Sequence, residues 1–248
     1  MGKLNEQKQL RSEAAKQPGF TLAEVLITLG IIGIVAALTM PTLIQNHRKQ
    51  VIETRLKKFY STVNQAVKLA EVDYGDKKLW YADLAGAQID EDGNIIEGSS
   101  ESEKWFKKYL APYIQITKFE TLPNGAFLAY LPDGSAFGPN QDNTRDWFFY
   151  PSEPAKCINK NSADDMNGSC RFVFCFYPPK INIVWNAEHW KYHTDKGFEP
   201  NKYRWDGQES SLLSGCEGNP PVNHNHAFCT ALIQYNNWKI PDNYPRKL

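Results

Sequence analysis

The sequence predicts an α+β protein. One long N-terminal helix, half membrane-spanning and half amphipathic, is expected to pack on a C-terminal antiparallel β-sheet with disulfide-stapled loops. Three observations carry this prediction. An apolar run occupies residues 20–44, and apolar residues then recur with helical spacing to residue 70. The second half alternates short apolar segments with Asn-Gly and Asp-Gly pairs.

The totals describe a chain that can bury a sizeable core. It has 248 residues, and its 28 basic and 28 acidic side chains cancel. The net charge is therefore zero and does not favour binding to nucleic acid. No nucleic-acid partner is expected. All 7 Trp residues lie beyond residue 79, which indicates a well-packed C-terminal part.

The apolar run has three interpretations. From Phe20 to Ile44 it is long enough as a helix to cross a hydrocarbon core of roughly 30 Å. A buried helix of a soluble protein is disfavoured, because no equally long apolar partner exists elsewhere in the chain. A cleaved secretory signal is disfavoured as well, because no A-x-A-like site closes the run.

The third interpretation explains a charge inside the run. Glu24 would cost roughly 2.5–3.5 kcal/mol in a spanning helix, so it needs a partner or a task. The segment KQPGFTLAEVLITLGIIGIVAALTMP resembles the N-terminus of type IV pilins and the related type II secretion pseudopilins. This resemblance implies that a prepilin peptidase removes residues 1–19 by cutting after Gly19. Phe20 then becomes the N-methylated first residue of the mature chain.

Glu24 matches the glutamate of that family. Cleavage would place a positive amine on Phe20 in lipid or in a filament core, where Glu24 of a neighbouring subunit can neutralise it. Such a pair would also fix the axial register of the helices. The alternative is a carboxylate that stabilises a helix N-terminus through the helix dipole.

The helix is expected to continue as an amphipathic segment over residues 45–75. Gly75 is a stop signal. Pro41 removes one backbone hydrogen bond and is expected to kink the helix, whereas Gly30 and Gly33 admit close helix packing or local unwinding. The residues that form the apolar stripe are Ile44, Val51, Ile52, Phe59, Val63, Ala66, Val67 and Ala70.

Residues 76–248 are expected to form the globular domain. SEKWFKKYL predicts a short helix, and CTALIQYNNWKIPDNYP predicts another that ends before Pro241. The turns in LPNGAFLAYLPDGSAF are hairpin signals and indicate an antiparallel sheet. The strand candidates are YIQITKF, AFLAYL, DWFFY, RFVFCFY and INIVW.

Five cysteines lie in this second half, and none forms a C-x-x-C pair. Two disulfides and one free thiol are favoured, which implies an oxidising, extracytoplasmic location. Five buried thiols in a cytosolic fold are the alternative. Cys157 and Cys170 are 13 residues apart, as are Cys216 and Cys229. Either pair would close a short loop, but the sequence leaves Cys175 open as a replacement partner.

Candidate metal and catalytic patterns have simpler structural interpretations. Asp90, Asp92 and Asn94 share the D-x-D-x-N spacing of a calcium loop, but Gly93 is not at the sixth loop position. An acidic surface turn is favoured over calcium there, and Asp164–Asp165 is an equally slight calcium candidate. His189 and His193 lack the H-E-x-x-H pattern, and His224-Asn225-His226 has no further ligands. No G-x-S-x-G elbow is present, so neither a cofactor nor an enzymatic activity is expected.

Together these observations predict a pilin-like filament subunit, either a minor pilin or a pseudopilin, for a type IV pilus or a type II secretion pseudopilus. The resemblance implies four kinds of partner: identical or related pilin subunits, the prepilin peptidase/methyltransferase, the inner-membrane assembly platform and the membrane. It also implies a single-pass topology with a cytoplasmic N-terminus and an extracytoplasmic globular domain. The machine is left open among adhesion or twitching, secretion and DNA uptake.

A second function class stays open. A membrane-anchored extracytoplasmic protein that never polymerises would have the same anchor. Its aromatic segment at residues 185–205 would then bind a ligand such as a carbohydrate.

Overall fold

The computed structural model describes residues 19–122, 125–140, 143–158, 166–179, 184–218 and 225–248. Contacts within the chain divide it into two units, with the boundary between Asn46 and His47. The predicted α+β class, with a long apolar helix, an antiparallel sheet and two disulfides, is confirmed.

The longest element is helix α2 (Leu22–Tyr74), which has 53 residues and continues through Pro41. It ends where the sequence predicts. Gly75 adopts a left-handed φ of 79°, and its N–H donates to the carbonyl of Glu71 at 3.0 Å. A glycine in this conformation satisfies a helix carbonyl without steric cost and terminates the helix.

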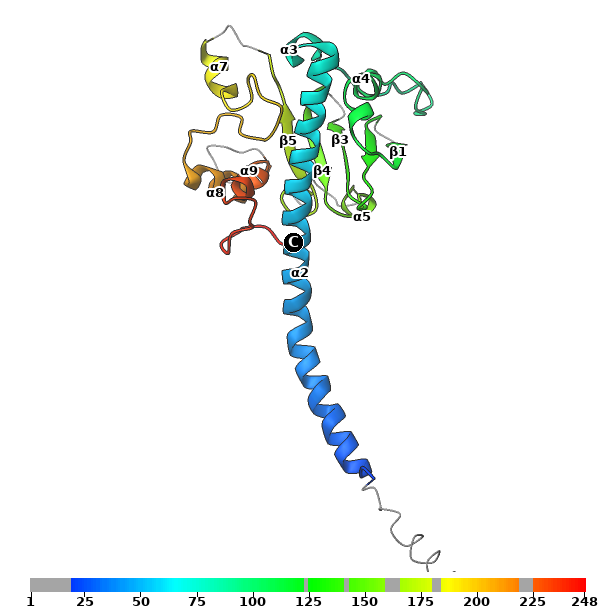
Figure 1. Cartoon of the computed structure of the whole chain (residues 1–248), viewed down its shortest axis with the longest axis vertical. Coiled ribbons are helices and arrows are strands. Elements are labelled where there is room, and N and C mark those ends of the chain that lie inside the picture. The colour runs from blue at the N-terminus through cyan, green and yellow to red at the C-terminus, as the bar shows by residue number, and fades with distance from the viewer. Residues whose placement is uncertain (1–18, 123–124, 141–142, 159–165, 180–183, 219–224) are drawn as a thin grey trace, which may run out of the picture. The chain divides into compact units, whose positions relative to one another are not determined.

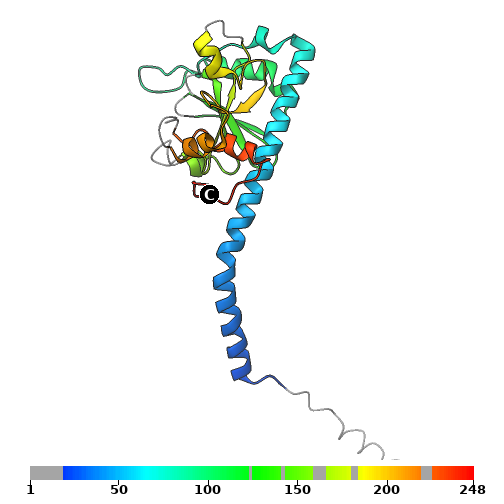
Figure 2. The same ribbon diagram turned by 90° about the vertical axis from the view of Figure 1, so that its left-hand side faces the viewer.

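The C-terminal part of α2 lies along one face of a sheet (Figures 1 and 2). The predicted apolar stripe is buried from Ile52 onwards, with two differences. Ile44 precedes the unit boundary and is 62% exposed, and Val51 is only half-buried. Leu56, which the prediction omitted, is fully buried. The buried residues of α2 are Ile52, Leu56, Phe59, Val63, Ala66, Val67 and Ala70.

The sheet is a six-stranded meander in which every pair of neighbouring strands is antiparallel. The hairpin between the second and third strands has the predicted Asp-Gly turn, where the N–H of Leu131 donates to the carbonyl of Ser135 at 2.8 Å. The strands are β1 (Lys118–Thr121), β2 (Phe127–Tyr130), β3 (Ala136–Asn140), β4 (Asn143–Tyr150), β5 (Phe172–Phe176) and β6 (Phe198–Pro200).

Aromatic side chains fill the space between α2 and the sheet. The ring of Phe59 stacks on Phe149 with centroids 4.5 Å apart, and it contacts Phe137 and Phe174 at 5.0 Å each. Alternate residues of a strand share one face, and on the face of β4 and β5 towards α2 large aromatic side chains alternate along the strands. These residues are Trp147, Phe149, Phe172, Phe174 and Phe176.

The remaining helices are short, and two of them, α4 and α9, were predicted. Their bounds are α3 (Lys77–Trp80), α4 (Glu101–Tyr109), α5 (Ala155–Ile158), α7 (Val184–Trp190), α8 (Glu209–Glu217) and α9 (Cys229–Tyr235), with one 3-10 turn, η1 (Ala111–Tyr113).

The strand predictions differ from the structure at three places. Of the predicted strand YIQITKF only Lys118 and Phe119 are in β1, because Tyr113 ends the 3-10 turn η1. The predicted strand INIVW is wrong in its described part, because Val184 begins α7. A five-residue apolar run cannot distinguish a strand from a helix, and the residues that follow continue the helix. The strand β6 was not predicted. It has three residues and ends at Pro200, which suits an edge strand but is too short to show alternation.

Candidate functional site

The predicted cleavage site lies ahead of α2. The side chain of Phe20 is 88% exposed, and a Cβ atom built on Gly19 would have no atom within 4 Å. Among the described residues, none therefore shields the peptide bond between Gly19 and Phe20. The rest of the predicted leader, residues 1–18, lies outside the described residues.

Glu24 forms a reciprocal capping box with Thr21. The backbone N–H of Thr21 donates to Oε2 of Glu24 at 2.8 Å, and the N–H of Glu24 donates to Oγ1 of Thr21 at 3.2 Å. This T-x-x-E pattern satisfies two helix N–H groups. The sequence contained the signal, but Thr21 was not among the predicted site residues. Glu24 itself is exposed.

The first half of α2 presents apolar side chains on all sides. Cβ atoms built on Gly30 and Gly33 would meet no atom within 4 Å, so both glycines leave room for a closely packed neighbour. The kink expected at Pro41 stays a prediction. The exposed apolar residues are Leu22, Val25, Leu26, Ile27, Leu29, Ile31, Ile32, Ile34, Val35, Leu38, Met40, Leu43 and Ile44.

This half of α2 makes the helix a candidate membrane span. Among the described residues it is the one helix long and apolar enough to cross a bilayer, and its most apolar stretch buries no residue within the chain. Such a surface is far larger than the apolar patches of soluble monomers. Lipid or other protein chains would cover such a surface.

Both expected disulfides are present. Cys157 pairs with Cys170, and Cys216 pairs with Cys229, with Cα–Cα distances of 5.7 and 4.5 Å. Cys175 is the free, buried cysteine. The sequence had left its pairing open.

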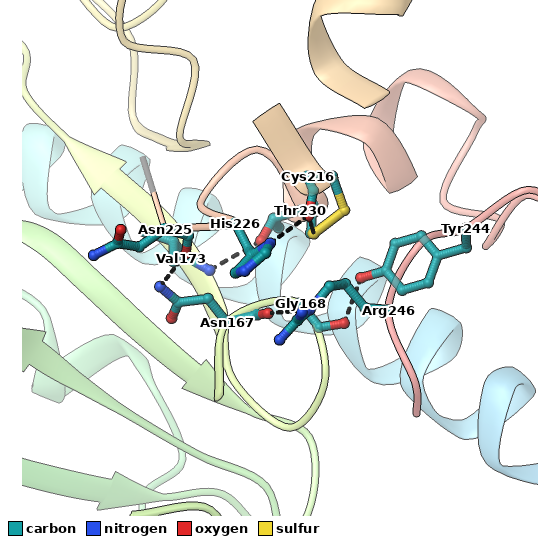
Figure 3. Close-up of a disulfide and its surroundings, with 10 residues drawn as sticks. Asn167, Gly168, Val173, Cys216, Asn225, His226, Thr230, Tyr244 and Arg246 are labelled. Atoms are coloured by element: carbon teal, nitrogen blue, oxygen red, sulfur yellow. Dashed lines mark hydrogen bonds between the residues drawn. A yellow bond between two sulfur atoms is a disulfide. The ribbon is translucent and has the colours of Figure 1, made fainter. Parts of the chain in front are cut away.

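Three segments of the chain meet around the second disulfide (Figure 3). The ring Nδ1 of His226 lies 2.7 Å from the carbonyl oxygen of Cys216. The hydroxyl of Tyr244 donates to the carbonyl of Gly168 at 2.6 Å, and Nε of Arg246 donates to the carbonyl of Asn167 at 3.3 Å. The disulfide therefore stands beside the contact between the C-terminal segment and the turn at residues 167–168.

The acidic turn that was considered for calcium is closed by its own side chain. Oδ1 of Asp90 accepts hydrogen bonds from the backbone N–H groups of Asp92 and Asn94 at 3.0 and 2.7 Å. These bonds account for an aspartate at this position without a metal. No group of three or more metal-ligating side chains occurs among the described residues. Asp164 and Asp165 lie outside the described residues.

The histidines at positions 189 and 193, which the sequence did not favour as metal ligands, are explained in part by burial. His193 is completely buried, and its Nε2 accepts a hydrogen bond from the N–H of Lys202 at 3.0 Å. Burial, together with the charges of Lys202 and Lys196, lowers the pKa of His193 to about 3. His193 is therefore a neutral core residue. His224 lies outside the described residues.

Comparisons with known proteins match both parts of the chain. A model of a family of unknown function (DUF6613) matches residues 42–248. A model of the prokaryotic N-terminal methylation motif matches residues 14–40, the stretch that contains Gly19, Phe20 and Glu24. No curated protein and no solved structure matches the chain.

Proposed function

Because this chain belongs to a family of unknown function (DUF6613) and carries the prokaryotic N-terminal methylation motif, we propose that it is a minor pilin or a pseudopilin. The motif supports the coarser part of this function directly. It supports a pilin-like protein that is processed by prepilin peptidase. Assembly of this chain into a filament is part of the proposal. The finer role rests on the arguments below.

The exposed apolar half of α2 is the observation that carries the proposal. A chain with this surface is stable only where lipid or neighbouring helices cover it. In the membrane, lipid covers the helix before assembly. In a filament, the same residues of other subunits replace the lipid, and Gly30 and Gly33 admit close approach of the helix backbones.

Glu24 gives this packing a register. Once Phe20 carries a free amine, the amine and the carboxylate of Glu24 are each costly in an apolar filament core and tolerable as a pair. The capping box holds Glu24 within one turn of the new N-terminus. Two helices that slide past one another would separate the pair, so the pairing favours one axial offset between subunits.

The topology follows from the same features. The leader stays in the cytoplasm, where the resemblance places the peptidase, and the second unit lies outside the cytoplasm. The two disulfides support this location, because disulfides persist in oxidising compartments. We assign no catalytic role to this chain, since the processing chemistry belongs to the peptidase.

Intact mass spectrometry of the protein from its own cells tests the proposal. We expect a chain that begins at Phe20 with one added methyl group, both in membranes and in filaments sheared from the cell surface. A chain that begins at Met1, or one cut after the apolar run, would contradict prepilin processing. A correctly processed chain that never enters a filament fraction would favour the membrane-anchored binding protein instead.

A further inference from the structure

The outer face of the sheet, opposite α2, carries an open cleft. Its floor is formed by the outward-facing residues of β4 and β5, in which Asp146 pairs with Cys175 and Phe148 pairs with Val173 across the two strands. The cleft has a volume of about 720 Å³. Pockets for small ligands typically have volumes of roughly 300–1,000 Å³.

A buried arginine stands at one end of this floor. Arg171 is only 8% exposed, and its guanidinium carbon lies 3.8 Å from the centroid of the Phe148 ring. Its Nε donates to Oδ1 of Asn167 at 2.8 Å. Asn167 is itself held by a 2.8 Å hydrogen bond from its Nδ2 to the carbonyl of Asn225 (Figure 3).

The charge of Arg171 has no acidic partner in the described part of the chain. None of the ion pairs there includes it. Burial lowers the pKa of Arg171, and among the described residues the opposing contribution comes from the Tyr150 hydroxyl. A buried cation is costly unless it is paired, so Arg171 favours an anionic group in the cleft.

The second arginine of the cleft, Arg145, differs from Arg171 in having an acidic partner among the described residues. Nη2 of Arg145 lies 2.8 Å from Oδ2 of Asp146, and the two side chains form an ion pair. Its guanidinium also lies 5.3 Å from the ring of Trp190. The charge of Arg145 is therefore compensated within the chain, and Arg171 is the cation that a ligand would neutralise.

The walls of the cleft suit a hydroxylated ring. Asn140, Asn201 and Asn225 line the cleft, and an asparagine amide can both donate and accept hydrogen bonds, as sugar hydroxyls do. Oδ1 of Asn201 already accepts one from the N–H of Tyr203 at 3.0 Å. Tyr177 and Tyr203 add half-buried aromatic rings, whose flat apolar faces can pack against the C–H face of a sugar.

We propose that this cleft binds a carboxylate-bearing saccharide. The guanidinium of Arg171 holds the carboxylate with paired N–H groups, because its planar fork matches the two oxygens. The amides and tyrosine rings hold the sugar. This inference does not depend on filament assembly, and it gives the globular domain a recognition task of its own.

Titration of the full-length chain with D-glucuronate tests the proposal, with saturation-transfer NMR as the readout. The detergent must lack a sugar headgroup, since such a headgroup would compete for the cleft. We expect binding of glucuronate, and at least tenfold weaker binding of D-glucose and of inorganic phosphate. Absence of glucuronate binding at about 10 mM, or equal binding of glucose or phosphate, would overturn the proposal.

Variants link the binding to Arg171. Arg171→Met removes the charge but keeps the length, and it should weaken glucuronate binding at least tenfold. Its thermal midpoint should change little, because relief of the desolvation penalty of a buried cation offsets the lost contacts with Asn167 and Phe148.

The matched control is Arg55→Met on the α2 side of the sheet. There the guanidinium donates to the carbonyls of Pro151 and Asp133. This variant should lower the thermal midpoint and leave glucuronate binding unchanged. Unchanged binding in Arg171→Met, or an equal loss in both variants, would refute the assignment to Arg171.

Discussion

Oε2 of Glu24 accepts a 2.8 Å hydrogen bond from the backbone N–H of Thr21, and the Thr21 hydroxyl accepts one in return from the N–H of Glu24. Two roles therefore meet on one carboxylate, that of a helix cap and that of a proposed partner for the Phe20 amine. The cap needs a hydrogen-bond acceptor, whereas the pairing needs a negative charge. Glutamine also serves at this position of a capping box, so the two roles can be separated.

Glu24→Gln should leave peptidase cleavage and the start of the helix intact but abolish incorporation into filaments, because the amine of Phe20 loses its counter-charge. Thr21→Val is the matched control. It keeps the shape of the side chain and removes the hydroxyl, which should weaken the helix start by about 0.5–2 kcal/mol and leave incorporation in place. Immunoblots of processed chain in membrane and sheared filament fractions measure both. Normal filament incorporation of the Glu24→Gln chain would rule out the pairing.

Phe59 is the central side chain between α2 and the sheet. It is 2% exposed and contacts the rings of Phe137, Phe149 and Phe174. Phe59→Ala should lower the free energy of unfolding by about 3–5 kcal/mol, since a large cavity would remain. Val72→Ala on the same helix is the control, because Val72 is 81% exposed and should change stability by less than about 0.5 kcal/mol. Denaturant titrations of the full chain followed by near-UV circular dichroism compare the two. Equal losses of stability in the two variants would show that the packing of α2 on the sheet does not depend on the Phe59 ring.

Much of the fold was predictable because its signals are local. The end of α2 at Tyr74 follows from Gly75, and the hairpin between β2 and β3 follows from the Asp133-Gly134 turn. The spacing of Cys157 with Cys170 and of Cys216 with Cys229 suggested the pairings that the structure contains, although it did not exclude Cys175.

The cleft could not be predicted from the sequence, because its geometry depends on contacts between residues that are distant in the chain. Arg171 belongs to a predicted strand, but its position over Phe148 depends on the register between β4 and β5. Register is a long-range property that the alternation of one strand does not specify. The loops that bring Asn201 and Asn225 to the same cleft carry no periodic signal.

Glu53 of α2 binds the C-terminal segment at residues 239–240. Oε1 of Glu53 accepts from the backbone N–H of Ile240 at 2.9 Å, and Oε2 pairs with Nζ of Lys239 at 2.7 Å. Glu53→Ala should lower the free energy of unfolding by about 1–3 kcal/mol, because the N–H of the buried residue Ile240 would lose its hydrogen-bond acceptor. Glu53→Gln keeps an acceptor and loses only the exposed ion pair with Lys239, so it should cost less than about 1 kcal/mol. Chemical denaturation measures both. If glutamine proves as harmful as alanine, the ion pair and not the backbone bond holds the segment.

Gly168 is placed against the disulfide between Cys216 and Cys229 (Figure 3). Its φ is 72°, and a Cβ atom there would lie 2.6 Å from Cβ of Cys229. Gly168→Ala therefore combines backbone strain with overpacking. It should lower the free energy of unfolding by more than about 2 kcal/mol. Gly93→Ala isolates the strain, because Gly93 has a similar φ of 83° and open space around it. It should cost about 1 kcal/mol. Thermal unfolding of both variants tests the difference, and equal costs would mean that the loop moves away from Cys229 without penalty.

The buried imidazole of His193 makes stability depend on pH. Its pKa falls from its ordinary 6.5 to about 3 in the folded chain, chiefly through burial. Between these values the unfolded chain binds the proton and the folded chain does not. The free energy of unfolding therefore rises with pH in this window.

The stability contributed by neutral His193 should be fully present above pH 6.5. As the pH falls towards 3, about 1.4 kcal/mol should be lost for each unit. His193→Gln can still accept the bond from the N–H of Lys202 but does not titrate, so its denaturation midpoint should change less between pH 7 and pH 5. Denaturant titrations of both chains at the two pH values measure the difference. Identical pH dependence in the two chains would show that the loss of stability in acid comes from other groups.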